Sequence, residues 1–181
     1  LVLLAEDREG YGNLSELITI GRRRTLKGDY RLDRADLARG LPHCTALWLA
    51  DDDPAPEDGR WLAERFPGRC WIAVELHRTG GDRERLARRR ALAQATGLPL
   101  VATGGALMHE RARQPLQDVL TAIRLGVPVA KAGLALQPNA ERHLRTLADL
   151  ARFYPADLLA ESLVIAARCT FSLDELRYEY P

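Results

Sequence analysis

The chain is poor in cysteine and has no long apolar run. These two features argue against a disulfide-rich protein and a membrane-spanning protein. Its three cysteines, Cys44, Cys70 and Cys169, are an odd number without a paired spacing, a usage typical of reduced thiols in a cytoplasm. No apolar stretch is long enough to span a bilayer. Leu1–Ala5 is apolar but lacks the basic leader of a signal peptide. We therefore expect a cytoplasmic protein with no membrane partner.

Motifs with a recognisable chemistry are also missing. The sequence contains no C-x-x-C or H-E-x-x-H pattern and no Walker-type phosphate loop, and no Ser/His/Asp or Cys/His arrangement can be assembled. Its 26 basic and 25 acidic residues leave a net charge of +1, so total charge does not favour nucleic-acid binding. The composition and the length of 181 residues are those of one ordinary globular domain.

Four short apolar runs predict buried strands. They are Leu1–Ala5, Thr45–Ala50, Trp71–Glu75 and Leu98–Thr103. Each run is followed by a stretch with helical spacing, an alternation that predicts an α/β fold with a mainly parallel sheet. Because the first run begins at the first residue, without a preceding turn or methionine, we expect an excerpt from a longer chain.

Seven stretches carry helix signals. They are Tyr11–Arg24 after a turn and cap at Glu9–Asn13, a short helix from Asp33, a helix capped by Asp51–Asp53 and running to Phe66, Asp82–Thr96 with Asp82 as cap and Gly97 as stop, Leu116–Leu125, Asn139–Phe153 and Ala156–Cys169. No strand is predicted after Leu116. We therefore divide the chain into βα units over residues 1–125 and a helical segment over 126–181, which ends in a linker at Tyr178–Pro181.

Two places at strand ends could hold a site, because ligands in parallel α/β folds bind where strands end. The loop Thr103–His109 offers His109 as a metal ligand beside Glu110, but a metal needs three or four donors, so we interpret His109 as a polar loop residue. Glu75 and His77, two apart on a strand, face the same side. They are either a catalytic pair or a hydrogen-bonded pair joined by Arg78.

Basic residues gather in three clusters that could contact phosphates. The first is Arg22, Arg23 and Arg24 with Lys27, the second is Arg83, Arg85 and Arg88–Arg90, and the third is Arg111 with Arg113. Acidic residues interrupt these clusters, so solvated helix faces are the favoured interpretation. Trp48, Trp61 and Trp71 lie on predicted buried elements, where core packing accounts for them.

Several segments together resemble the polymerase-and-histidinol-phosphatase (PHP) domain of bacterial C-family DNA polymerases of the polymerase III alpha-subunit type. They are Leu1–Ala5 with Arg8–Thr19, Trp71–Arg78, Leu98–Thr103, Gln114–Arg124, Asn139–Arg145 and Phe171–Pro181. Within them, Asp118–Arg124, Glu141–Arg145 and Leu176–Pro181 favour the error-prone branch. The similarity runs in consistent order over nearly the whole chain.

The resemblance implies a distorted α/β barrel, of which this chain would hold the later βα units. It also implies an error-prone DNA-directed DNA polymerase that acts in damage-induced mutagenesis and translesion synthesis. Its Mg²⁺-binding carboxylates would lie in a palm domain after Pro181, so no catalytic residue and no cofactor is expected within this segment. DNA and deoxynucleotides would be partners of the full-length enzyme. The sliding clamp and accessory mutagenesis proteins are further candidates, and Gln114–Gln117 superficially begins like a clamp-binding peptide.

The family pattern at the fourth strand end is Asp-x-His followed by another His, a set of metal ligands. Aligned here, the first two positions are Gly105 and Leu107, and the last survives as His109. Glycine and leucine have no donor, so the departure predicts a metal-free, structural module with Glu75, His77 and His109 as relict polar groups. Earlier histidine ligands would precede Leu1. The alternatives are a metal-dependent PHP phosphoesterase or exonuclease, and a docking module for accessory proteins.

Overall fold

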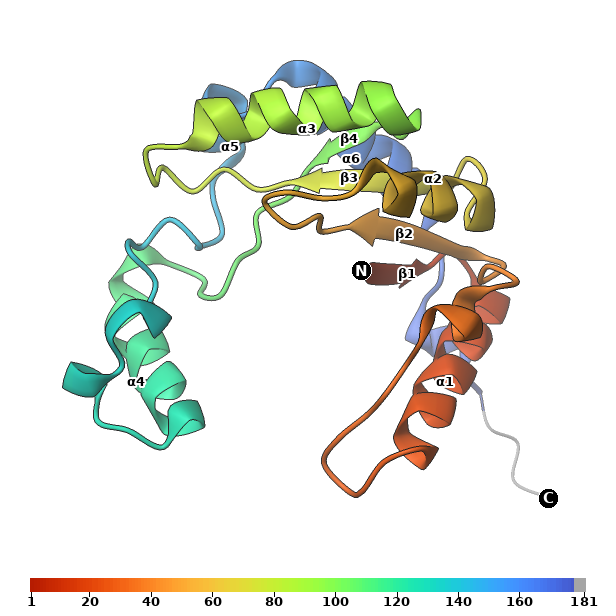
Figure 1. Cartoon of the computed structure of the whole chain (residues 1–181), viewed down its shortest axis with the longest axis horizontal. Helices are drawn as coiled ribbons and strands as arrows, with labels where there is room; N and C mark the ends of the chain where they lie inside the picture. Colours follow the sequence, from red (N-terminus) through yellow and green to blue (C-terminus); the bar gives the residue numbers. More distant parts are fainter. Residues whose placement is uncertain (178–181) are drawn as a thin grey trace.

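The computed structural model describes residues 1–177, and within them four strands form one open sheet. The strands are β1 (Val2–Ala5), β2 (Cys44–Trp48), β3 (Cys70–Val74) and β4 (Leu100–Ala102), ordered as in the sequence. β1 is antiparallel to β2, and β2, β3 and β4 are parallel. The predicted α/β class with a mainly parallel sheet is confirmed, whereas the sheet is open and its closure into a barrel stays an expectation (Figure 1).

The helices occupy most of the predicted stretches, with shifted ends. They are α1 (Arg8–Arg23), α2 (Pro56–Arg65), α3 (Asp82–Thr96), α4 (Gln114–Leu125), α5 (Leu147–Phe153) and α6 (Ala156–Arg168). Short 3₁₀ turns lie between them: η1 (Arg34–Leu37), η2 (Arg111–Arg113), η3 (Val129–Lys131), η4 (Gly133–Ala135) and η5 (Leu173–Glu175). Among the residues described, no helix is long and apolar enough to cross a membrane. The predicted linker end at Tyr178–Pro181 lies outside the described residues.

The core lies on both faces of the sheet. On one face, alternate residues of β2 and β3 pack against α2 and α3, and Phe66 and Ile72 are fully buried there. On the other face, Trp71 and Val101 pack against Ile165 of α6. The indole N–H of Trp71 also donates to Glu161 of α6 at 2.7 Å. Trp71, one of the three tryptophans that the sequence analysis assigned to the core, is therefore a core residue whose indole N–H is hydrogen-bonded.

The start of α1 differs from the prediction. The expected turn at Glu9–Asn13 is wrong, because these residues lie inside the helix, which begins at Arg8. Asp7 is the N-cap, and its carboxylate accepts a hydrogen bond from the Gly10 N–H at 2.9 Å. A Cβ atom at Gly10 would overlap the carbonyl oxygen of His43. Glycine is therefore required for helix packing here, and the sequence alone had suggested a turn.

Two predicted caps are also wrong. α2 is preceded by Ala55 and begins at Pro56, so Asp51–Asp53 do not cap it. Gly81 is the N-cap of α3, so Asp82 is the first residue of the helix and not its cap. The Asp82 carboxylate instead accepts hydrogen bonds from the N–H groups of His77 (3.3 Å) and Arg78 (2.7 Å). The predicted stop is confirmed: Gly97 ends α3 in the left-handed conformation, with φ 74°.

The predicted helix over Asn139–Phe153 is wrong in its first half. Only Leu147–Phe153 is helical, and residues 139–146 form a loop that pairs with Met108 through an isolated bridge at His143. Asn139, Arg142 and Arg145 of this loop donate hydrogen bonds to backbone carbonyl groups of the loops after β3 and β4. The division of the chain at residue 126 stays a prediction.

Candidate functional site at the strand ends

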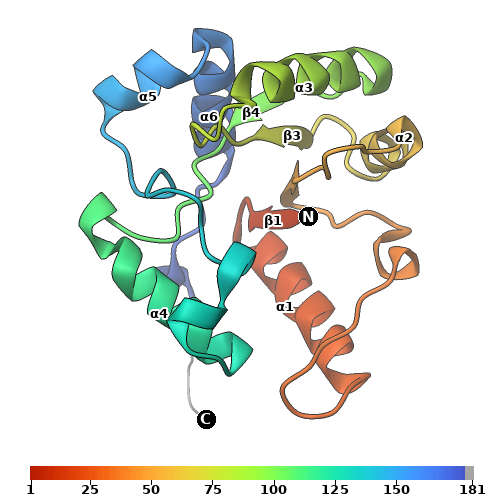
Figure 2. The ribbon, with the colours of Figure 1, turned by 60° about the vertical axis from the view of Figure 1, so that its left-hand side comes forward.

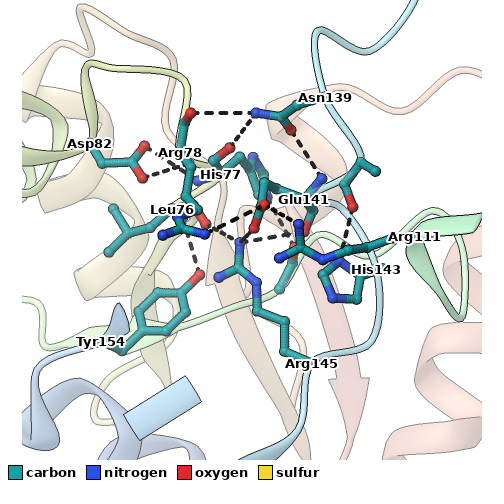
Figure 3. Close-up of polar contacts among 12 residues, drawn as sticks. Leu76, His77, Arg78, Asp82, Arg111, Asn139, Glu141, His143, Arg145 and Tyr154 are labelled. Carbon is teal, nitrogen blue, oxygen red and sulfur yellow. Dashed lines mark hydrogen bonds and ion pairs between the residues drawn. The ribbon is translucent and has the colours of Figure 1, made fainter. Parts of the chain in front are cut away.

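Three loops meet beyond the carboxyl ends of the parallel strands. Residues 75–81 follow β3 and residues 103–110 follow β4, and neighbouring parallel strands bring these two loops together. The third loop, residues 139–146, packs across both of them (Figure 3). This is the edge of the sheet at which the sequence predicted a site.

Glu75 lies beside Gly105, where the resemblance led us to predict a replaced metal ligand. The Glu75 carboxylate is 3.7 Å from Nη2 of Arg142, and Nε of Arg142 donates to the Gly105 carbonyl at 2.8 Å. Gly105 has φ +51°, and a Cβ atom there would overlap the Glu75 carboxylate and lie 2.8 Å from Arg142 Nη2. The space next to Gly105 is therefore filled by an ion pair of this chain.

His77 is directed at the same turn but has its own partner. It is buried, and its Nε2 lies 3.0 Å from the Gly104 carbonyl oxygen. The structure thus brings Glu75 and His77 to adjacent residues of one turn and gives each a separate contact. Arg78, the predicted third member, lies over the Phe153 ring instead, 4.6 Å from its centroid.

His109, which the sequence analysis interpreted as a relict polar group, is a surface residue. The His109 side chain is 63% exposed and lies 3.5 Å from the Glu110 carboxylate. Gly105 and Leu107 hold no donor, and Glu75 is paired with Arg142. Within residues 1–177, no three His, Cys, Asp or Glu side chains are gathered as metal ligands would be. The described side chains at the strand ends therefore do not form the set of metal ligands that the resemblance implied.

The most buried carboxylate of the region was missed by the sequence analysis. The Glu141 side chain is 7% exposed and faces three guanidinium groups. Arg111 lies at 2.8 Å, Arg145 at 3.4 Å and Arg78 at 3.9 Å. A buried carboxylate is stable only when it is paired and hydrogen-bonded. Glu141 therefore joins the loop after β3, the turn before α4 and its own loop.

Arg145 and Tyr154 extend this network into the core. Arg145, 3% exposed, donates to the Leu76 carbonyl at 2.7 Å and stacks on Phe153 at 4.8 Å. The Tyr154 hydroxyl accepts from the Leu76 N–H at 3.1 Å and donates to the Thr103 carbonyl at 2.8 Å. Burial raises the pKa of Tyr154 above its usual 10. These contacts connect the strand ends to Phe153 at the end of α5 and to Tyr154 between α5 and α6.

A sequence signal for this network existed in the predicted helix itself. Within residues 139–145 the apolar residues Ala140 and Leu144 are the only two, too few for a stripe that could bury a helix face. Asn139, directly after Pro138, donates to the His77 carbonyl at 2.8 Å. Because residues 139–145 follow a proline and lack an apolar stripe, the sequence indicated a loop at this position and not a helix.

Most arginines proposed for phosphate contact have partners within the chain. Arg24 pairs with both carboxylate oxygens of Asp36 at 2.6 and 2.7 Å, and Arg22 lies over the Tyr30 ring at 5.9 Å. Arg111 is held by Glu141, and Arg113 lies 3.5 Å from Glu110. Arg23, at the end of α1, is exposed. Nucleic-acid contact by these residues stays a prediction.

Comparison with known proteins gives one consistent answer over the whole chain. No family model matches it. All of the chain aligns with proteins named error-prone DNA polymerase, at 60% identity for Methylococcus capsulatus, 59% for Dechloromonas aromatica and 55% for Pseudomonas aeruginosa. It covers 17%, 18% and 18% of those relatives, so it spans less than a fifth of their length. The chain is homologous to a segment of bacterial error-prone DNA polymerases.

Proposed function

We propose that the chain is a segment of an error-prone DNA-directed DNA polymerase that acts in damage-induced mutagenesis and translesion synthesis. The observation that carries this proposal is the 55–60% identity, over the whole chain, to proteins with that name. Because the chain spans 17–18% of their length, nucleotidyl transfer belongs to the full-length protein. DNA and deoxynucleotides are its substrates in this proposal, and the Mg²⁺ that assists phosphoryl transfer binds outside this segment.

Within that enzyme, we propose that the segment is a structural PHP-type module that works without a metal. Arg142 supports this role, because its guanidinium lies against Glu75 and Gly105 at the strand ends. A guanidinium keeps its charge at all physiological pH values and can neutralise a carboxylate permanently. The Glu141 network supports the same role, since it joins three loops at the strand ends through ion pairs of this chain.

Primer extension by the full-length protein tests the polymerase. We expect Mg²⁺-dependent extension on an undamaged template and bypass of an abasic site, both abolished by EDTA. No extension on the undamaged template would contradict the proposal as a whole. Extension that stops at every lesion would contradict only the role in translesion synthesis.

Metal analysis of the full-length protein tests the structural module. After purification without chelators, we expect substoichiometric Zn, Mn and Fe and no hydrolysis of p-nitrophenyl phosphate. One equivalent of tightly bound metal that is lost in His109→Ala would favour the phosphoesterase alternative.

Docking of the sliding clamp or accessory mutagenesis proteins is tested by pull-down. Gln114 is already engaged with the Gln137 carbonyl at 3.2 Å, so we expect Gln114→Ala to leave clamp binding unchanged.

A further inference from the structure

A hollow of about 550 Å³ lies between α3, α5 and the loop after β3. We call it the arginine hollow, and it is lined by Leu76, Arg78, Arg83, Leu86, Arg152 and Phe153. α3 and α5 lie together on the side of the molecule opposite to α1 and α4 in both views (Figures 1 and 2). None of the lining residues belongs to a strand, so the open edges of the sheet do not form this hollow.

The floor of the arginine hollow is apolar and its rim is basic. Leu76 is buried, and Leu86 and Phe153 are half-buried against the core. Arg83 and Arg152 are exposed, and neither forms an ion pair with another residue of 1–177. The rim therefore carries two guanidinium charges that the described part of the chain does not pair with a carboxylate.

Arg78 is held in place at the edge of the hollow by its own backbone. Its φ of +53° is uncommon for a residue other than glycine. The Asp82 carboxylate accepts a hydrogen bond from the Arg78 N–H at 2.7 Å (Figure 3), and the guanidinium lies 4.6 Å from the centroid of the Phe153 ring. Backbone in such a conformation is concentrated at binding and active sites. The carboxylate that lines the hollow is thus used to position an arginine of the rim.

We propose that the arginine hollow binds an acidic peptide segment of another protein, with an apolar side chain on the floor and carboxylates against the rim. Such binding does not depend on the polymerase activity of the full-length protein. Complementary charge selects this occupant, because guanidinium groups pair with carboxylates in a fixed geometry. The floor of leucine and phenylalanine side chains fits an apolar anchor.

Two other occupants fit less well. Phosphates of a nucleic acid could pair with the rim, but the bases would meet aliphatic side chains, and the Phe153 ring already carries the guanidinium groups of Arg78 and Arg145. An apolar surface of the same polypeptide would bury the charges of Arg83 and Arg152 without partners, which is costly. The peptide satisfies both the floor and the rim.

Fluorescence anisotropy with the full-length protein tests the proposal. The probe is a fluorescein-labelled peptide with one phenylalanine between two runs of aspartate. We expect saturable binding that falls about tenfold when Arg83→Ala and Arg152→Ala are combined, because two exposed ion pairs are lost. The matched control combines Arg23→Ala with Arg88→Ala, which removes two exposed charges outside the hollow and should change binding by less than about twofold. A peptide with serine in place of phenylalanine should bind about tenfold more weakly, because the apolar anchor is gone.

Equal losses in the two double variants would overturn the proposal, because binding would then follow total charge. Equal affinity for the serine peptide would also overturn it, and this comparison needs no variant and stays decisive if one unfolds. Absence of binding by the natural full-length protein would overturn it too, including the case in which the polypeptide's own residues fill the hollow. A thymidine oligonucleotide that binds more weakly only to the Arg83 and Arg152 variant, without peptide binding, would assign the hollow to nucleic acid instead.

Discussion

The sheet body and the α4 lobe are held together by different forces. The sheet body, β1–β4 with α2, α3 and α6, encloses fully buried apolar side chains such as Phe66 and Ile72. The α4 lobe, residues 107–146, exposes its aliphatic face, and Asn139, Glu141 and Arg145 tie it to residues 76–78 of the body through polar contacts. Apolar burial is non-directional, whereas ion pairs depend on geometry. The body is thus stabilised by its own core, whereas the lobe depends on polar contacts for its position.

Truncation of one large side chain in each region should give the greatest contrast. Phe66→Ala removes a ring that is 0% exposed and should lower the free energy of unfolding by about 3–5 kcal/mol. Leu120→Ala, at 53% exposure, should change it by less than about 0.5 kcal/mol. Urea unfolding of the 181-residue chain, followed by tryptophan fluorescence, measures both. A large loss for Leu120→Ala would mean that the lobe has a core of its own.

Loss of the Glu141 charge should weaken the lobe and its attachment to the body, because the carboxylate pairs with Arg111 and Arg145 of the lobe and with Arg78 of the body. Glu141→Gln keeps the shape but leaves Arg145, 3% exposed, without its carboxylate. We expect a loss of about 2–3 kcal/mol in unfolding free energy, since hydrogen bonds to charged groups are worth more than neutral ones. We also expect faster proteolysis within residues 107–146. Glu110→Gln is the matched control, because its carboxylate is 54% exposed and its pairs are screened by solvent. Equal effects of the two changes would refute the distinction.

The turn at Gly105 should tolerate a side chain poorly. Gly105→Ala places a Cβ atom at φ +51°, a strain of about 1–2 kcal/mol, and pushes the Glu75 carboxylate away from Arg142. At Gly104 the nearest heavy atom to an added Cβ would be 4.0 Å away, so Gly104→Ala should be neutral within about 0.5 kcal/mol. Thermal melts of the two variants compare adjacent positions of one turn. A neutral Gly105→Ala would show that the ion pair moves freely.

The same contrast explains what the sequence could predict. The strands of the body were found because short apolar runs bounded by turns are a local signal, although Leu98–Thr103 proved to be a strand only over Leu100–Ala102. Gly97 was found as a helix stop for the same reason. The position of Glu75 and His77 after β3 was predicted because strand ends are recognisable from the pattern, whereas their separate contacts with Arg142 and Gly104 were not predicted.

The contacts of the lobe were missed because their partners are distant in sequence. Asn139 bonds to a carbonyl 62 residues earlier and Arg145 to one 69 residues earlier. A glutamate in a stretch that resembles a helix is usually solvated, so the pattern gave no reason to bury Glu141. Arg24 pairs with Asp36, twelve residues later, and this contact does not decide between a solvated helix face and contact with phosphates.

The smallest effect on stability should come from the surface pair of His43 and Asp7 at the start of α1. Nδ1 of His43 lies 2.6 Å from the Asp7 carboxylate, and Nε2 lies 3.5 Å from Glu9. The hydrogen bond to Asp7 raises the pKa of His43 above 6.5. The Gly10 N–H and then His43 lower the pKa of Asp7 below 3.8. The pair therefore stabilises the fold most between about pH 3.8 and 6.5.

The two limits follow from the direction of each shift. The stabilisation by His43 is fully present below pH 6.5 and is lost as the pH rises through its raised pKa, and that by Asp7 is lost as the pH falls through its lowered pKa. His43→Asn retains a residue that tolerates the φ of +57° found there but removes the titration. We expect its melting temperature to lie below that of the natural chain at pH 5.5 and to approach it by pH 8.5. A constant difference across that range would assign the effect to packing of the ring, and the charge would then contribute nothing to the start of α1.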